Sequence, residues 1–212
     1  MPFDIDEFAR LRPYLYHVSD RGNLPVLRAT RQLRTAASLI RSAHRLEWLN
    51  LRRAEPVRLA TPDGTIVLKD QRPLIAANIE LTAEWSLGEF VQYLNSFTYF
   101  WPGNDRGPIG AGQRLLDHYE EEGPVVLRVP TLDLLRENAL TQPEFCAFNS
   151  GAPRYHSGKR AIRGPHLFKT AAEFPRRASE VVEVAFRGDV TLPVATRLRA
   201  IGSWDDLFPR VS

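Results

Sequence analysis

The sequence predicts an α+β fold, in which helices and strands are mixed without a regular alternation. Apolar residues recur at helical spacing in some segments and alternate as in strands in others. The predicted strands are short and irregularly spaced, so the strand–helix–strand rhythm of a doubly wound sheet is missing. The chain has 212 residues, a length at which one domain is the default. We therefore expect a single domain over 1–212.

The composition is that of an ordinary globular protein. Hydrophobic residues make up 43% of the chain and charged residues 25%, and the formal net charge is +3. These values exclude a disordered chain, and the single Cys excludes an internal disulfide. No stretch approaches the ~20 apolar residues of a membrane span, and the N-terminus lacks the apolar core of a signal peptide. We expect a cytoplasmic protein without a membrane partner.

The first third of the chain predicts helices around one strand, followed by a hairpin. The expected elements are a helix over 5–11, a strand over 14–18, a helix with Asn23 as N-cap and Pro25 in its first turn, and a long helix over 35–53 capped by Thr35 or Ser38. Two β-rich runs on either side of a Pro-Asp-Gly turn then predict a hairpin over 57–70.

The rest of the chain predicts further short elements separated by loops. They are a helix over 86–95, a strand over 97–101 ended by Pro102, a Gly-rich surface loop over 103–112 leading into a helix, a buried strand over 124–129, a short helix capped by Thr131, a short strand and turn over 146–151, a polar loop over 152–177 and a last strand over 180–186.

Several kinds of chemistry lack a sequence signature here. The Gly-rich loop has neither the Walker A pattern nor GxGxxG between a strand and a helix. The five His and one Cys show no metal-ligand spacing, so we expect no metal site. Cys146 has no His at the spacing of a known thiol-enzyme family.

Glu183 is the most informative charged residue. In the last predicted strand, alternation places Val182, Val184 and Phe186 on one face and Glu183 with Ala185 on the other. A Glu beside a small residue in a hydrophobic strand indicates either a cleft or a solvent-exposed sheet face. Glu180 has the opposite parity at the start of the strand and is the second candidate.

Other candidates are His17 on the first strand, the pair Arg52-Arg53 at the end of the predicted long helix, and the aromatic residues Tyr99 and Phe100. Each has a structural alternative. A His on a strand is often a satisfied core residue, paired arginines suit a helix C-terminus, and aromatic clusters often belong to a core.

These segments, taken in order, resemble DarT-type ADP-ribosyltransferases. The segments that carry the resemblance are Tyr16-His17-Val18, the run Asp20 to Leu27, Leu51-Arg52-Arg53 before a hairpin, Tyr99-Phe100-Trp101-Pro102, Val125 to Val129, Phe148-Asn149-Ser150-Gly151, and Glu183-Val184-Ala185-Phe186. The chain is more similar still to an uncharacterised bacterial domain family, through Arg52 to Leu59, Asp70 to Pro73 and Leu94-Asn95. The resemblance extends over roughly residues 14 to 193 and implies a split β-sheet core with flanking helices.

The resemblance also implies an activity and a set of site residues. NAD would be the co-substrate of a transferase that modifies DNA or RNA as a toxin or phage-defence effector, with an antitoxin or macrodomain hydrolase as partner. The implied catalytic residues are Glu183 and Arg53. The implied NAD-binding residues are His17, Asn23, Arg52, Tyr99, Phe100, Asn149 and Ser150.

The acceptor is left open by the sequence. DarT-type proteins continue their aromatic-Pro segment differently, and their substrate-reading loop is not recognisable here. A basic segment with Arg154, Lys159, Arg160 and Arg163 could hold an anionic acceptor or be a solvated loop. Two alternative functions are a catalytically silent nucleotide- or nucleic-acid-binding module on the same fold and an RNA 2′-phosphotransferase-like enzyme.

Overall fold

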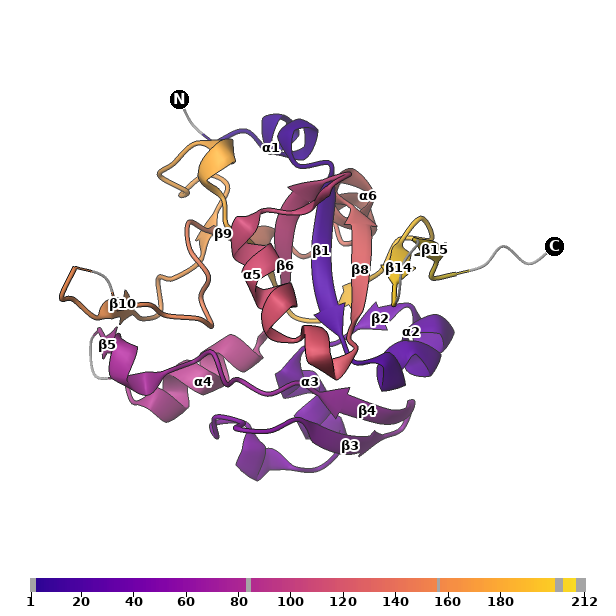
Figure 1. Cartoon of the computed structure of the whole chain (residues 1–212), viewed down its shortest axis with the longest axis horizontal. Helices are drawn as coiled ribbons and strands as arrows, with labels where there is room; N and C mark the ends of the chain where they lie inside the picture. The colour runs from indigo at the N-terminus through magenta and orange to yellow at the C-terminus, as the bar shows by residue number, and fades with distance from the viewer. Residues whose placement is uncertain (1–2, 83–84, 156, 201–203, 209–212) are drawn as a thin grey trace.

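An antiparallel sheet forms the centre of the molecule (Figure 1), and the computed structural model describes residues 3–82, 85–155, 157–200 and 204–208. The strand order is β11-β9-β12-β6-β1-β8-β14-β15, with β7 beside β6. The bounds are β1 Tyr14–Ser19, β6 Phe97–Asn104, β7 Gly107–Pro108, β8 Val125–Pro130, β9 Pro143–Cys146, β11 Lys169–Thr170, β12 Glu183–Arg187, β14 Arg197–Arg199 and β15 Asp205–Asp206. Helices lie between these strands along the chain, so the predicted α+β class is confirmed.

Helices cover both faces of this sheet (Figure 1). The α-helices of the described residues are α1 Ile5–Leu11, α2 Leu24–Thr30, α3 Ala36–Ser42, α4 Leu87–Asn95, α5 Gly110–His118 and α6 Thr131–Glu137, and 3₁₀ turns span Arg21–Asn23, Leu46–Trp48, Ala76–Asn78, Glu120–Glu122 and Ala178–Glu180. Helix α5 packs Leu116 against Trp101 on one face. On the other face Phe8 of α1 and Leu134 of α6 join Phe100 in the largest apolar cluster.

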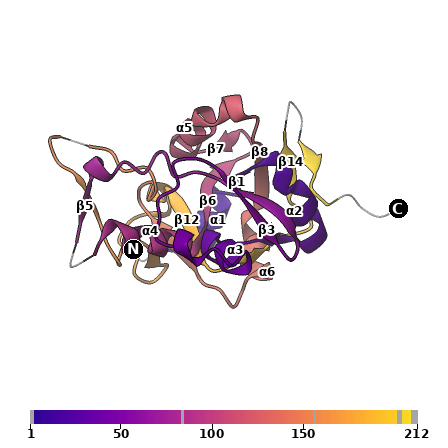
Figure 2. The same ribbon diagram turned by 90° about the horizontal axis from the view of Figure 1, so that it is seen from below.

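Within the described residues, three two-stranded pairs lie outside the central sheet. The hairpin β3 Val57–Thr61 with β4 Gly64–Leu68 and the pair β2 Gln32–Leu33 with β13 Val190–Thr191 are antiparallel, whereas β5 Ile79–Leu81 and β10 Ala161–Arg163 are parallel. In Figure 1 the hairpin and α3 lie below the end of β1, and the β5–β10 pair projects to one side. Figure 2, seen from below, places β3 and α3 nearest the viewer.

The central sheet opens between β1 and β6. The two strands pair only from Tyr14, opposite Gly103, to Tyr16, opposite Trp101. Beyond this point β1 continues its pairing with β8 as far as Ser19. Strand β6 is there paired with β12 on its other side. The two halves of the sheet therefore separate at the level of His17 and Tyr99.

The prediction of one long helix before the hairpin is wrong in its length. The helix expected over 35–53 ends at Ser42, although Thr35 caps it as predicted. His44 adopts a left-handed φ of 54°, and the N–H of Arg45 turns back to the carbonyl of Ile40. This hydrogen bond closes the helix, as a left-handed residue commonly does at a helix C-terminus. The arginine pair 52–53 therefore follows an irregular segment and not a helix.

The segment 97–112 is more ordered than expected. Strand β6 does not end at Pro102 but continues to Asn104. Pro102 has no backbone N–H to donate, but β12 pairs with β6 only as far as Phe100, so no hydrogen bond to β12 is lost at Pro102. The expected surface loop is a tight β6–β7 turn that leads into α5. A Cβ on Gly103 would lie 2.2 Å from a backbone oxygen, and one on Gly112 would lie 2.7 Å from Trp101. These glycines permit close packing.

Smaller corrections concern caps and strand ends. Asn23 precedes α2 but makes no cap hydrogen bond. Thr131 is the first residue of α6, and its hydroxyl donates to the Arg12 carbonyl at 2.6 Å. Strand β9 ends at Cys146, where the predicted strand begins, because the following residues form a turn. The other predicted helices, the 57–70 hairpin and the strands at 14–18 and 124–129 are confirmed.

Candidate functional site

A cavity of about 270 Å³ occupies the opening between β1 and β6. Its walls come from the end of β1, the start of β6, the β3–β4 hairpin, helices α2 and α3, and the turn after β9. Its polar lining includes His17, Ser19, Asn23, Gln32, Arg34, Arg53, Asp63, Asp70, Gln71, Asn95, Tyr99, Asn149, Ser150 and Glu183. Seven of the nine residues that the sequence singles out for NAD binding or catalysis thus lie around one space.

Glu183 lies at the start of β12 and lines this cavity. The predicted alternation holds, since Val184 and Phe186 join the apolar cluster on the opposite face. The residue is 2% exposed, and its carboxylate accepts a hydrogen bond from the Ser150 backbone N–H at 3.1 Å. Burial raises its pKa from 4.5 to about 7, against the opposing effects of the Ser150 hydrogen bonds and the Arg163 charge. A buried carboxyl poised near neutrality is typical of a functional site.

Glu180, the alternative carboxylate, lies elsewhere. It belongs to a 3₁₀ turn before β12, forms an ion pair with Arg176 at 3.4 Å, and does not line the cavity. Of the two candidate carboxylates, the structure places only Glu183 beside the other candidate residues.

Arg53 enters the cavity from the segment before the hairpin and is 5% exposed. Its Nε donates to the Lys69 carbonyl at 3.0 Å and its Nη1 to Asn95 Oδ1 at 3.1 Å. No carboxylate among the described residues forms an ion pair with Arg53, and none of these residues accepts a hydrogen bond from Nη2. Burial lowers its pKa to about 10, partly offset by the charge of Asp70. An arginine remains charged there, so the cavity holds a buried cation that forms no ion pair with a described residue.

Arg52 has a different place. Its side chain braces the 72–74 segment through bonds from Nε to the Leu74 carbonyl at 2.6 Å and from Nη2 to the Arg72 carbonyl at 3.1 Å. It does not line the cavity. The structure therefore places Arg53, and not Arg52, where a ligand could meet it.

His17 spans the gap between the two separated strands. Its Nδ1 lies 2.8 Å from the Tyr99 carbonyl oxygen, which can only accept, so Nδ1 carries the hydrogen. Burial lowers the pKa of the ring below 6.5, and the neutral ring then has a hydrogen-bond acceptor at Nε2. None of the described residues donates to Nε2, and His17 lines the cavity.

Tyr99 and Phe100 point to opposite faces of the sheet, because they are consecutive residues on one strand. Tyr99 lines the cavity and donates its hydroxyl to the Leu94 carbonyl at 2.6 Å. Phe100 points to the other face, where it packs edge-on against Phe186 with ring centroids 5.9 Å apart. Phe100 is fully buried in the apolar core, so the structure does not bring it to the cavity with the other candidate residues.

The side chain of Asn23 has a structural role. Its side-chain oxygen accepts from the Val67 N–H at 2.7 Å, and its amide donates to the Val67 carbonyl at 2.9 Å and to Ser19 Oγ at 3.2 Å. These bonds attach the β3–β4 hairpin to the end of β1. Asn23 shapes the cavity wall in this way, and its hydrogen-bonding groups are taken by protein partners.

The turn after β9 supplies Asn149 and Ser150. Both line the cavity, and Ser150 is the partner of Glu183. Of the basic segment, Arg154, Lys159 and Arg160 are exposed, whereas Arg163 is 6% exposed and lies behind this turn. The four basic residues therefore do not act together as one surface for an anionic acceptor.

Sequence reasoning missed several polar residues of the cavity wall. Asn95 Oδ1 accepts from both Arg53 and Gln71, at 3.1 and 3.3 Å. Asn95 lies four residues after Val91 on the buried face of α4, and a polar residue at an apolar position is a signal that could have found it. Asp70 accepts from the Tyr119 hydroxyl at 3.0 Å. It has no equivalent signal, because Tyr119 lies 49 positions away.

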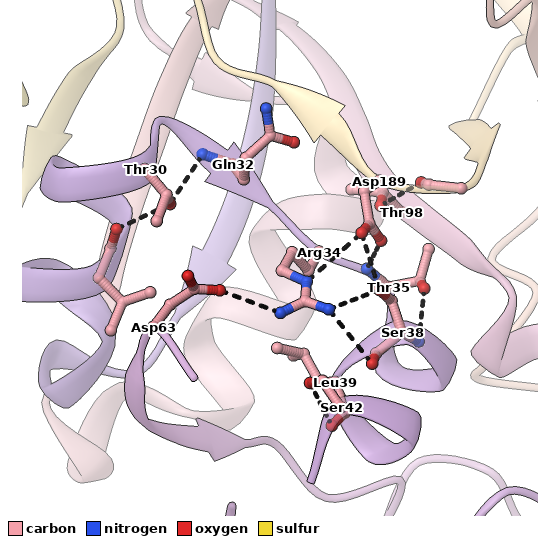
Figure 3. A network of polar contacts seen from close by, with 12 residues as sticks. Thr30, Gln32, Arg34, Thr35, Ser38, Leu39, Ser42, Asp63, Thr98 and Asp189 are labelled. Carbon is pink, nitrogen blue, oxygen red and sulfur yellow. Dashed lines mark hydrogen bonds and ion pairs between the residues drawn. The ribbon is translucent and has the colours of Figure 1, made fainter. Parts of the chain in front are cut away.

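Arg34 lines the cavity and lies at the centre of a polar network (Figure 3). Its guanidinium contacts Asp63 in the hairpin turn at 3.2 Å and Asp189 after β12 at 3.4 Å. Asp189 also accepts from the Thr35 N–H at 2.7 Å and from the Ser38 hydroxyl at 2.8 Å. The network joins α3, the hairpin and the end of β12, which are the elements that enclose the site.

Among the described residues, no group of three or more His, Cys, Asp and Glu side chains is arranged to hold a metal ion. Within the same residues, no helix combines the length and apolar character needed to cross a bilayer. The site is therefore described by its acid, its arginine and its hydrogen-bonding groups.

Comparison with known proteins gives one result. The model of a family of unknown function, DUF7002, matches residues 13–196 of the chain. No curated protein and no solved structure matches it. The matched range contains every residue of the cavity lining.

Proposed function

The chain belongs to the DUF7002 family of unknown function, and we propose that it is an NAD-dependent ADP-ribosyltransferase built on a split-sheet core of that enzyme class. The observation that carries this proposal is the pair of buried, unpaired groups in one cavity. Glu183 and Arg53 are each at least 95% buried, and neither forms an ion pair with a described residue.

Buried charges without partners are costly, because they lose hydration without gaining a counterion. A ligand that carries complementary charges in one molecule would offset this cost. NAD⁺ has an anionic diphosphate that suits the Arg53 guanidinium. It also has a nicotinamide–ribose bond whose cleavage develops positive charge on the sugar, which suits an ionised Glu183.

The other residues of the cavity fit this assignment. His17 offers an acceptor at Nε2 for a ribose hydroxyl. The Tyr99 ring forms a wall of the cavity near Glu183. The Ser150 N–H orients the carboxylate. Arg53 is itself held by Lys69 and Asn95, so its free terminal nitrogen is already directed.

In the proposed reaction the bond between nicotinamide nitrogen and ribose carbon breaks, and nicotinamide leaves with the bonding electron pair. A nucleophilic atom of the acceptor then bonds to the same carbon, and its proton passes to Glu183 or to water. Glu183 must be ionised to stabilise the positive charge that develops on the ribose and to accept this proton. With a pKa of about 7, we expect the rate to rise as the pH increases through neutrality.

The test incubates the protein with NAD labelled in its adenylate part, separately with DNA, RNA, cell lysate and buffer alone. Nicotinamide release and transfer of label to one pool are expected, and both are lost in Glu183→Gln. The matched control is Glu180→Gln, on the adjacent turn outside the cavity. Binding of NAD without nicotinamide release in any arm would support a silent binding module and refute the transferase. Removal of an RNA 2′-phosphate with NAD consumption only in that arm would identify the phosphotransferase alternative.

A further inference from the structure

Arg163 is a buried arginine behind the wall of the cavity that the proposed reaction leaves unexplained. It is 6% exposed and does not line the cavity. Its guanidinium makes three hydrogen bonds to backbone carbonyls, from Nη1 to Ile162 at 2.9 Å, from Nε to Ser150 at 3.3 Å and from Nη2 to Asn149 at 3.3 Å. None of the described carboxylates forms an ion pair with it.

Two of these contacts involve the turn that holds Glu183. The Asn149 carbonyl and the Ser150 N–H belong to the same peptide unit. In a trans peptide these two groups point in opposite directions. Arg163 binds the carbonyl side, and the N–H side donates to the Glu183 carboxylate at 3.1 Å. Fixing the carbonyl therefore aims the N–H at Glu183.

We propose that Arg163 is a positioning residue for Glu183, acting through the peptide unit that joins Asn149 to Ser150. The inference rests on the proposed function only in calling Glu183 the reacting carboxylate. A guanidinium on the carbonyl oxygen polarises the peptide unit and makes its N–H a stronger donor, because hydrogen bonds in a chain reinforce one another. The same cation lies close enough to Glu183 to favour its ionised form.

The position of Arg163 is itself fixed from several sides. Its backbone carbonyl accepts from the Thr82 N–H at 2.8 Å, next to the parallel pair of β5 and β10. Its guanidinium lies over the Phe148 ring, 4.3 Å from the centroid. A flexible surface arginine would lose this geometry. Arg163 is therefore prearranged, as a residue that orients a reacting group must be.

Other titratable groups face Glu183 from the neighbouring strands. Tyr99 comes from β6, and burial raises its pKa well above 10. Cys146 comes from β9, and burial raises its pKa to about 12. Both groups are neutral near pH 7. Among the described residues, Arg163 is then the charged group whose field acts on the Glu183 carboxylate.

The experiment compares Arg163→Met with Arg163→Lys by NMR, in the protein without NAD. The Glu183 side-chain carboxyl ¹³C and the Ser150 amide ¹H are followed from pH 5 to pH 9. In Arg163→Met we expect the Glu183 midpoint to move upward by about one pH unit and the Ser150 amide resonance to move upfield. In Arg163→Lys the charge remains but the planar fork is lost. We therefore expect the midpoint to stay near that of the unmodified protein, while the Ser150 resonance still moves.

Arg176→Met is the matched control, since it removes one exposed arginine outside the cavity and should move neither signal. In kinetics, Arg163→Met should shift the pH profile of kcat upward and leave KM for NAD within about twofold, because Arg163 does not line the cavity. An unchanged Glu183 midpoint and Ser150 resonance in folded Arg163→Met would overturn the inference. If that variant does not fold, an unmoved Ser150 resonance in Arg163→Lys would do so. The NMR readout needs no turnover, so it remains decisive even if the protein does not cleave NAD.

Discussion

Replacing Glu183 with Gln should stabilise the protein at alkaline pH while abolishing its proposed activity. The side chain is 2% exposed, and burial raises its pKa from 4.5 to about 7. In the unfolded chain the carboxyl has its ordinary pKa and ionises first as the pH rises. The folded state retains the proton up to about pH 7. Folding stability is therefore lost between pH 4.5 and pH 7, and stays lost above it.

The size of this loss follows from the pKa difference. Each pKa unit corresponds to about 1.36 kcal/mol, so a rise from 4.5 to about 7 costs on the order of 3 kcal/mol of unfolding free energy at pH 8. Gln does not ionise, and its side-chain oxygen can still accept the Ser150 N–H. For a chain of 212 residues, a gain of that size corresponds to a rise in Tm of roughly 6–12 °C.

The assay is urea unfolding of both proteins at pH 4, 6 and 8, followed by circular dichroism. The stability gap should be small at pH 4 and reach about 3 kcal/mol at pH 8. Glu180→Gln is the control, and we expect a change within about 0.5 kcal/mol. A Gln variant that is less stable than the unmodified protein at pH 8, or a gap that is equal at pH 4 and pH 8, would refute the reasoning.

Three further predictions test the rest of the site. Arg53→Lys keeps the charge but has one nitrogen in place of three, so it cannot reach the Lys69 carbonyl and Asn95 from separate nitrogens and still direct a third into the cavity. We therefore expect kcat/KM for NAD to fall about 10- to 100-fold in nicotinamide-release kinetics; unchanged kinetics would remove Arg53 from the site. His17 should be a neutral ring protonated at Nδ1 at pH 6.5, because burial lowers its pKa; a two-bond ¹H–¹⁵N spectrum showing a doubly protonated ring at that pH would contradict this. Asn23→Ala should lower the unfolding free energy by about 2–4 kcal/mol, because it leaves both backbone groups of Val67 without their partner; a change under about 0.5 kcal/mol in urea unfolding would show that the hairpin does not depend on this tie.

The local pattern of the sequence predicts most of the helices and strands. It fails where contacts with residues distant in the sequence determine where an element ends. The hairpin at 57–70 and the helix at 86–95 are specified by their own turn and capping residues, so they could be read directly. The helix over 35–53 could not, since its apolar spacing continues past Ser42 although the backbone turns at His44. Strand β6 likewise continues through Pro102 because of where β12 stops pairing.

In the candidate site, too, local pattern predicts some features and not others. Alternation along one strand is a local property, and it placed Glu183 on the face opposite the apolar cluster. The same rule applied to Tyr99 and Phe100 would have separated them, since neighbours on a strand face opposite sides. The contacts of Arg53 with Asn95 and of Arg163 with the 149–150 peptide join residues that are 42 and 14 positions apart. No local pattern encodes such pairings.

The arginine content of the chain shows why burial, and not composition, indicates function here. Of 28 Lys and Arg residues only three are Lys, which is as consistent with a bias in codon usage as with anion binding. Such a bias adds arginines where they cost little, on surfaces. Arg53 and Arg163 are instead 5% and 6% exposed, and each holds its charge without a described carboxylate partner. Burying a cation without an ion pair lowers stability, so we expect each of these two positions to have a compensating role at the site. On the proposed function, Arg53 binds a ligand anion and Arg163 orients Glu183 and favours its ionised form.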